Sequence, residues 1–294
     1  MKKIKLISKI LLFLVIISCS SDDSSADGNE PMNNNNLVKR EYASNNINLE
    51  YRYNENNQLD QIIDIYTSEN IDSETDFVYD SNNVSSRSFV SNNSSFSSNT
   101  TFTYDSSNRL LNATKTINQP SNTVNPTITR TEEYSYNNNL ITINTSSSTG
   151  DTGIIMLERN NGLITKITRD QNYATIEYDN NQNITVINVF DSSNNLSHTS
   201  EYEYDNNPNP FFGQLSSIYL HLFVDAFDDF EFGEFVWDGY EGYFFPFLRN
   251  NIISIQENGN LDRNYQYSYN GQNNPTNVVE IFNGTNSFEF DIEY

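Results

Sequence analysis

One sequence pattern recurs along most of this 294-residue chain and restricts how the chain can fold. The unit is an aromatic residue, any residue, a tyrosine, Asp or Asn, two or three turn formers, and an aliphatic residue that opens a second apolar run. Two side chains separated by one position share a face only on an extended strand, so each unit predicts a β-hairpin. Copies begin at Tyr51, Phe77, Phe102, Tyr134, Ile176, Tyr202 and Tyr267, and a degenerate copy without the second tyrosine begins at Met156.

The turn of each unit accounts for an unusual composition, because the chain contains 49 Asn residues. An Asp or Asn that follows the tyrosine can accept hydrogen bonds from backbone amides two residues on. Asn also tolerates the left-handed backbone conformation of tight turns. We therefore interpret the Asn excess as turn chemistry and not as a prion-like tract.

Successive hairpins with short links predict an all-β fold, a curved antiparallel meander sheet of about 16 strands. The aromatic face of such a sheet has to be covered, so we expect a half-barrel or rolled sheet with Glu, Thr, Ser and Asn on the wet face. The alternating segment Phe288–Tyr294 also resembles the closing strand of an outer-membrane barrel. Most expected strands have about five to eight residues, fewer than the roughly 9–11 of a transmembrane strand, which disfavours that alternative.

The N-terminus has the layout of a secretory signal peptide. Four lysines in the first nine residues precede an apolar run from Ile10 to Ile17, which is too short to span a bilayer. The run ends at Ser18-Cys19, which resembles the lipobox of bacterial lipoproteins, and Cys19 is the only cysteine. The resemblance implies cleavage before Cys19 and membrane attachment through acyl chains on that residue; an ordinary signal peptide is the alternative. Residues 1–18 are then the signal peptide, and residues 19–40 form a flexible tether.

Two acidic residues follow the cysteine closely. Asp22 and Asp23 resemble the surface-export signal of Bacteroidota lipoproteins, which implies a lipid-anchored protein of the outer membrane that is exposed on the cell surface. The signal peptide holds four of the 16 Lys and Arg residues, so 12 remain against 39 acidic residues, a formal charge of −27. Such a surface repels nucleic acid and anionic lipopolysaccharide, and we expect no nucleic-acid partner.

The hairpin unit resembles the YD repeat of Rhs and teneurin shells, in which a Tyr-Asp step is followed by a Gly and an aliphatic residue. Here Asn mostly replaces that Gly, and the spacing varies between about 20 and 32 residues. A closer similarity is to uncharacterised Bacteroidota lipoproteins with degenerate YD-like hairpins, and it is carried by Tyr202–Phe211 and the Pro275-Thr276 step. That resemblance implies one domain, residues 41–294, with a curved antiparallel sheet, and it implies no chemistry.

The repeat lapses between Tyr204 and Tyr269, where an insert at about residues 206–250 is rich in Phe and acidic residues. A short helix or an apolar plug is expected within it. Three roles remain open: aromatic side chains that cap the sheet, a ligand platform that stacks on sugar rings, and a cation site without the usual calcium-loop pattern. The platform would comprise Trp237, Asp238, Tyr240, Glu241 and Tyr243 on a Gly-rich loop.

The sequence contains no nucleophile elbow, phosphate-binding loop or zinc-ligand spacing. We expect His198 to be solvated in a polar turn and His221 to lie on a helix or strand face without binding a metal. The prediction is therefore that the protein has no catalytic residues, no cofactor and no metal. The expected function is that of a noncatalytic outer-membrane scaffold or binding module for a glycan or protein partner. The alternative is a carbohydrate-active hydrolase with a carboxylate pair near Trp237.

Overall fold

The computed structural model describes residues 37–43, 47–66, 71–227, 246–282 and 285–294, and strands dominate these residues. Two helical elements, the 3₁₀ helix η2 (Ser216–Ile218) and the helix α1 (Tyr219–Asp225), follow the fourteenth strand. The strands are β1 (Arg40–Ala43), β2 (Ile47–Tyr53), β3 (Leu59–Tyr66), β4 (Ile71–Asp80), β5 (Asn83–Ser91), β6 (Ser97–Tyr104), β7 (Leu110–Asn118), β8 (Thr127–Asn137), β9 (Leu140–Ser147), β10 (Thr152–Asn160), β11 (Leu163–Arg169), β12 (Asn172–Tyr178), β13 (Ile184–Phe190), β14 (Leu196–Pro208), β15 (Asn250–Glu257), β16 (Asn260–Tyr269), β17 (Pro275–Phe282) and β18 (Thr285–Glu293).

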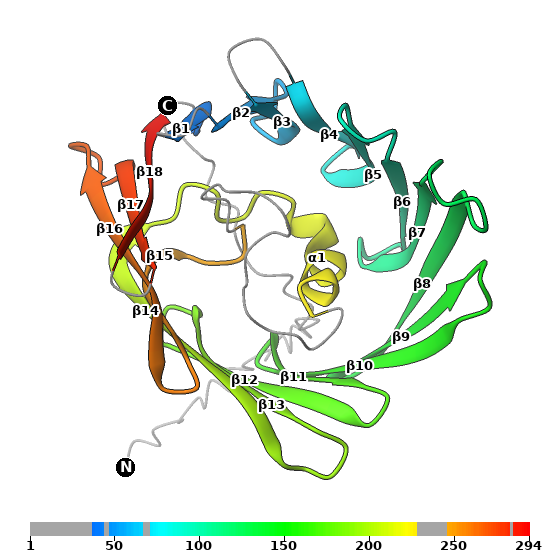
Figure 1. The fold of residues 1–294 in the computed structure, drawn as a ribbon. Coiled ribbons are helices and arrows are strands. Elements are labelled where there is room, and N and C mark those ends of the chain that lie inside the picture. The colour runs from blue at the N-terminus through cyan, green and yellow to red at the C-terminus, as the bar shows by residue number, and fades with distance from the viewer. Residues whose placement is uncertain (1–36, 44–46, 67–70, 228–245, 283–284) are drawn as a thin grey trace, which may run out of the picture.

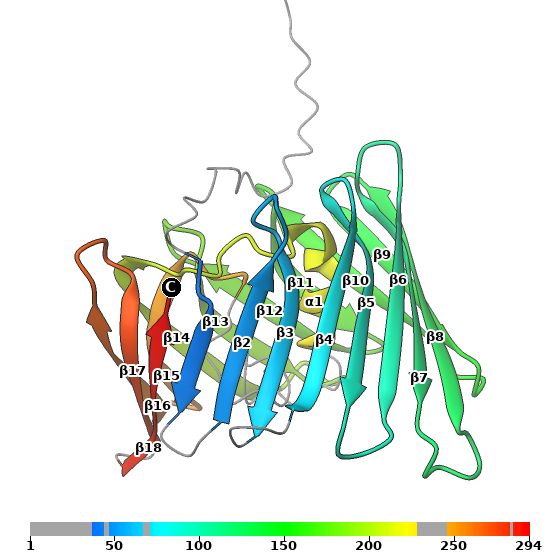
Figure 2. The ribbon, with the colours of Figure 1, turned by 90° about the horizontal axis from the view of Figure 1, so that it is seen from above.

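The strands form a closed barrel. Each strand pairs antiparallel with the next one along the chain, and β18 also pairs with β1 through the register from Arg40↔Glu293 to Ala43↔Phe290. Figure 1 shows the resulting ring of strands, and Figure 2, turned by 90°, shows the strands of the wall lengthwise and side by side. The all-β meander is confirmed as a rolled sheet, and the sheet is closed and not open like a half-barrel, because the four-residue strand β1 pairs with both β2 and β18.

In five copies of the repeat the first aromatic residue points into the barrel. Tyr51, Phe77, Phe102, Tyr134 and Tyr202 are all buried in one continuous hydrophobic core. In the degenerate copy the expected first position, Met156, faces outward and is 38% exposed, and the next residue, Leu157, is the one buried in the core. The predicted aromatic row on one covered face is confirmed for the five copies named above, whereas the degenerate copy is offset by one residue.

The second tyrosine of the repeat links neighbouring hairpins. In five copies its hydroxyl donates a hydrogen bond of 2.5–2.8 Å to the carbonyl of the first or second residue of the second strand in the preceding hairpin, as from Tyr104 to Val84. Burial raises the pKa of Tyr104 to about 12, so the phenol stays protonated and can donate. The pairs that follow this rule are Tyr79–Leu59, Tyr104–Val84, Tyr136–Leu110, Tyr178–Ile164 and Tyr204–Ile184, and Tyr267–Ile252 and Tyr294–Pro275 make similar bonds.

The turns use Asn as the sequence predicts. Among the described residues, Asn supplies seven of the eleven non-glycine positions with positive φ. The acidic or amide residue that follows the tyrosine organises the turn: Asp105 Oδ1 accepts from the backbone N–H of Ser107 at 2.8 Å and of Arg109 at 3.0 Å. Turn chemistry therefore explains much of the Asn content.

The insert enters the barrel. Figure 1 shows α1 inside the ring of strands, where it provides the short helix expected in this segment. Barrels of about 16–18 strands are too wide for wall side chains alone to fill. Phe211, Phe223 and Phe227 are fully buried and belong to the same core as the wall aromatics. The insert therefore supplies apolar packing that the wall alone would lack.

The outward side chains of the strands are mainly polar. Asp72, Glu74 and Asp76 occupy the outer face of β4, and Glu201 and Glu203 that of β14. Nine of the 18 described strands have seven or eight residues, within the expected range, and eight have 9–13, so strand length does not separate this barrel from a transmembrane one. The outer face carries carboxylates, and charged side chains are destabilising on a lipid-facing surface.

Within the described ranges no helix is both long enough and apolar enough to cross a bilayer.

Candidate functional site

The residues that the sequence singles out for binding lie outside the described residues. These are the lipidation residue and the proposed ligand platform: Cys19, Trp237, Asp238, Tyr240, Glu241 and Tyr243. Their roles stay predictions, as do the boundaries of the signal peptide and tether.

The described part of the chain brings together a different set of ionisable groups inside the barrel. Glu132 lies on β8, two residues before the buried Tyr134, so both side chains point inward. His221 and Asp225 are one turn apart on α1 and therefore share a face of the helix. This face of α1 packs against the wall, where the ring of Phe102 on β6 lies 5.2 Å from the imidazole, centroid to centroid.

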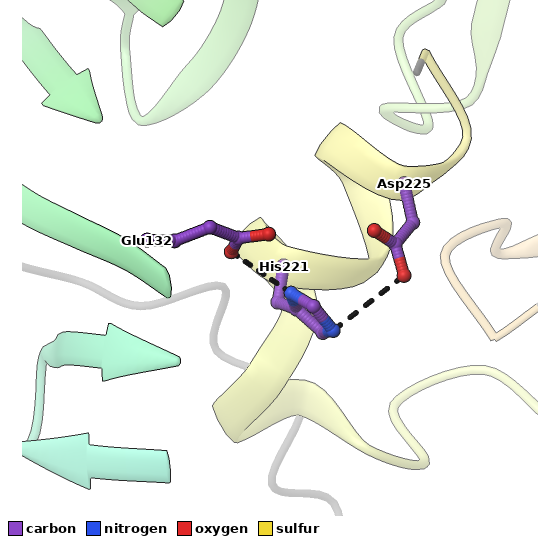
Figure 3. Close-up of side chains that lie close together, drawn as sticks. All are labelled: Glu132, His221 and Asp225. Atoms are coloured by element: carbon purple, nitrogen blue, oxygen red, sulfur yellow. Dashed lines mark hydrogen bonds and ion pairs between the residues drawn. The ribbon is translucent and has the colours of Figure 1, made fainter. Parts of the chain in front are cut away.

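The imidazole of His221 lies between two carboxylates. Its Nδ1 is 2.9 Å from Glu132 Oε2, and its Nε2 is 3.5 Å from Asp225 Oδ2 (Figure 3). The hydroxyl of Tyr134 donates a second hydrogen bond to Glu132 Oε2. Only 2% of the His221 side chain is exposed, against 16% for Glu132 and 38% for Asp225. The histidine of this ion pair between α1 and the wall is thus almost fully shielded from solvent, whereas its carboxylate partners are partly exposed.

A row of cations borders this cluster. Arg87 on β5 pairs in register with Thr100 on β6, which pairs with Lys115 on β7, which pairs with Arg130 on β8. All four positions lie on one cross-strand row of the inner face, two residues along β8 from Glu132. The acidic side chains of the cluster therefore face fixed positive charge on the wall.

These charges set the protonation states. Burial disfavours the charged imidazole, but the carboxylates of Asp225 and Glu132 outweigh burial and raise the pKa of His221 above its ordinary value. Burial also opposes the ionised carboxylate of Asp225, but His221 and the neighbouring Lys115 and Arg87 lower its pKa. Below this raised pKa the cluster is an imidazolium held between two carboxylates.

Metal binding is the first chemistry to consider, because one potential ligand atom from each of Glu132, His221 and Asp225 lies within 4.8 Å of the others. The two carboxylates approach different ring nitrogens from opposite sides of the imidazole (Figure 3). A metal ion bound to Nε2 could also bind Asp225, whereas Glu132 contacts Nδ1 and would only orient the ring. The ion would then have two protein ligands, fewer than the three of a catalytic zinc site. A neighbouring cation row also repels a divalent ion. The geometry fits a structural ion pair that fastens α1 to the wall.

The second histidine departs from its expectation. His198 points into the barrel from β14 and forms an ion pair with Glu257 on β15, and 23% of its side chain is exposed. Burial raises the pKa of Glu257, although Ser200 Oγ donates to its carboxylate at 3.0 Å. The prediction of a solvated turn residue is wrong, because strand β14 begins at Leu196 and includes the histidine.

Sequence reasoning missed the interior cluster, although one signal was available. The strand pattern that buries Tyr134 also directs Glu132 inward and Glu133 outward. A carboxylate that points into a barrel needs a hydrogen-bonding or cationic partner there. The two histidines of the chain were candidates for that partner. Nothing local links Glu132 to His221, which lies 89 residues further along the chain.

Comparisons with known proteins give distant likenesses in structure only. No protein-family model matches the chain, and no curated protein matches it. Among solved structures, a porin-like protein from Bacteroides vulgatus is 12% identical with a TM-score of 0.40, over 88% of this chain and 98% of that chain. A porin-like protein from Bacteroides uniformis is 12% identical with a TM-score of 0.35, over 75% and 95%. The TcdB2-TccC3-Cdc42 structure is 14% identical with a TM-score of 0.37, over 83% of this chain and 13% of that chain. None of these likenesses bears on activity, and the resemblance to YD-repeat lipoproteins stays a prediction.

Proposed function

We propose that the protein is a noncatalytic, lipid-anchored protein of the outer membrane, whose barrel stands in water and serves as a scaffold or binding module. The observation that carries the proposal is the polar outer wall, exemplified by Glu201 and Glu203 on β14. A wall of this kind does not suit lipid, so attachment requires another device. Cys19, the only cysteine, follows an apolar signal-like run and supplies one.

The interior supports a noncatalytic role. A general acid or base needs a side chain that can reach a substrate proton. The imidazole of His221 is instead held by Glu132 and Asp225 beneath the helix that it anchors, with 2% of its side chain exposed. His198 is paired with Glu257 on the neighbouring strand. Both histidines are therefore engaged by carboxylates within the fold. The binding partner that we propose for the protein is a glycan or another protein.

The direct test follows the acyl chains. Cells that process lipoproteins would express the full chain, the Cys19→Ala variant and a Ser25→Ala control in the tether, with radiolabelled palmitate in the medium. We expect label in the full chain and the control and none in Cys19→Ala, which leaves the outer-membrane fraction. Retention of unlabelled Cys19→Ala in that fraction would show that the barrel or a partner, and not a lipid, holds the protein there.

A further inference from the structure

A depression of about 480 Å³ lies on the end of the barrel where the Tyr-Asp turns gather. One side is the turn between β12 and β13, and the other is formed where β14 ends and β15 begins. Its lining is almost wholly amide and guanidinium groups, with one proline: Asn180, Asn181, Gln182, Asn206, Pro208, Arg249 and Asn250. Two segments that are distant in the sequence thus present polar side chains to one space.

The floor of the depression is held by a buried amide. Asn183 is fully buried, and its Oδ1 accepts from the backbone N–H of Arg249 at 2.8 Å and of Asn250 at 3.1 Å. Its Nδ2 donates to Asn250 Oδ1 at 2.9 Å and to Asp179 Oδ2 at 3.1 Å. These bonds fix the β12–β13 turn to the start of β15, so the two sides of the depression keep one geometry.

The guanidinium of Arg249 is also held in place. It lies 4.7 Å from the ring centroid of Phe212 and donates from Nη2 to Gln182 Oε1 at 2.8 Å. Among the described residues, no further side-chain bond engages this guanidinium, and none engages the amides of Asn180, Asn181 and Asn206. Three free amides and a preorganised cation therefore surround the same space.

We propose that this depression binds a neutral saccharide. Each primary amide offers two donors and an acceptor, which suits hydroxyl groups that both donate and accept. A pocket lined by polar groups favours a polar ligand, since apolar ligands need apolar walls. Arg249 is the only ionised group of the lining, and the overall charge of the chain, −23, opposes a polyanion. The inference rests on the proposed binding role, and it assigns that role to residues other than the Trp237 loop.

The test is affinity electrophoresis of the detergent-solubilised full chain in native gels that contain dextran, amylopectin or galactomannan, with polygalacturonate as the anionic counterpart. Asn181→Ala is the test variant, because its exposed amide has no internal partner. Asn56→Ala is the matched control, since Asn56 occupies the same position of the β2–β3 turn and is not among the residues that line this depression. We expect retardation by at least one neutral polymer and an apparent dissociation constant about five-fold weaker for Asn181→Ala, with Asn56→Ala unchanged.

Three outcomes would overturn the assignment. Retardation of Asn181→Ala equal to that of the unmodified chain would show that the glycan binds elsewhere, and loss of retardation in Trp237→Ala would then place it on the predicted platform and leave the proposed function standing. Retardation by polygalacturonate alone would contradict a neutral ligand. The absence of retardation in every gel would contradict the saccharide site, while palmitate labelling would still test the proposed lipoprotein separately.

Discussion

Replacing His221 by glutamine removes the positive charge that joins α1 to the barrel wall. The imidazole is 2% exposed, and its loss leaves Glu132 and Asp225 without their shared partner. Removal of one member of a buried ion pair costs about 3–5 kcal/mol, and the 38% exposure of Asp225 places the expected cost near the lower end, at about 3 kcal/mol. Urea denaturation followed by circular dichroism at pH 6 measures this loss as a change in the free energy of unfolding.

The pH dependence of that loss has a definite sign. The pKa of His221 is raised in the folded state, so its contribution is complete below the unfolded value of about 6.5 and is lost as pH rises through the folded value. The pKa of Asp225 is lowered, so its contribution is present above about pH 4 and is lost as pH falls through the folded value. The difference between the unmodified chain and His221→Gln should therefore be largest between about pH 4 and 6.5 and smaller at pH 9.

His198→Gln is the matched control, because it removes the other imidazole from a partly exposed ion pair. We expect it to cost less than about 1 kcal/mol. The account of the cluster is refuted if His221→Gln costs no more than this control at pH 6, or if its cost is the same at pH 6 and pH 9.

Two further predictions concern the wall and its turns. Tyr104→Phe should lower the free energy of unfolding by about 1 kcal/mol, because the bond to the Val84 carbonyl is lost. Tyr173→Phe, on the outer face and without such a bond, should change it by less than about 0.5 kcal/mol in the same urea titration; equal effects would remove the energetic role of the tyrosine bonds. Gly259→Ala should cost about 1 kcal/mol through its φ of 74° alone, since no atom lies within 4 Å of the added Cβ. Gly271→Ala also has no atom near the added Cβ, but Gly271 has no positive φ, so this change should be nearly neutral. A similar loss of stability in both variants would show that backbone conformation at Gly259 is not the cause.

Local chemistry made much of the wall predictable. The alternation that places Tyr51 and Tyr53 on one face follows from the geometry of an extended strand, and the Asn residues of the turns follow from their tolerance of positive φ. Closure was not predictable in this way. It depends on the pairing of β18 with the four-residue strand β1, which carries no copy of the repeat.

The interior cluster illustrates a different limit. The parity of β8 directs Glu132 inward, but the contact with His221 depends on the path of the insert inside the barrel. That path is set by apolar packing of Phe223 and Phe227 against the core, which has no short-range signature. The second tyrosine of the repeat was also understood only in part, because its hydroxyl bonds to the preceding hairpin and not to its own.

The most direct test of the central claim is the behaviour of residues 20–294, produced without the signal peptide and Cys19, in buffer that contains no detergent. A water-facing barrel that reaches the membrane only through its lipid should remain soluble and give a β-rich circular dichroism spectrum with a cooperative thermal transition. Size-exclusion chromatography with light scattering would then report a discrete species. Aggregation that only detergent or lipid vesicles reverse, with β structure regained on insertion, would contradict the account and identify the wall as membrane-embedded.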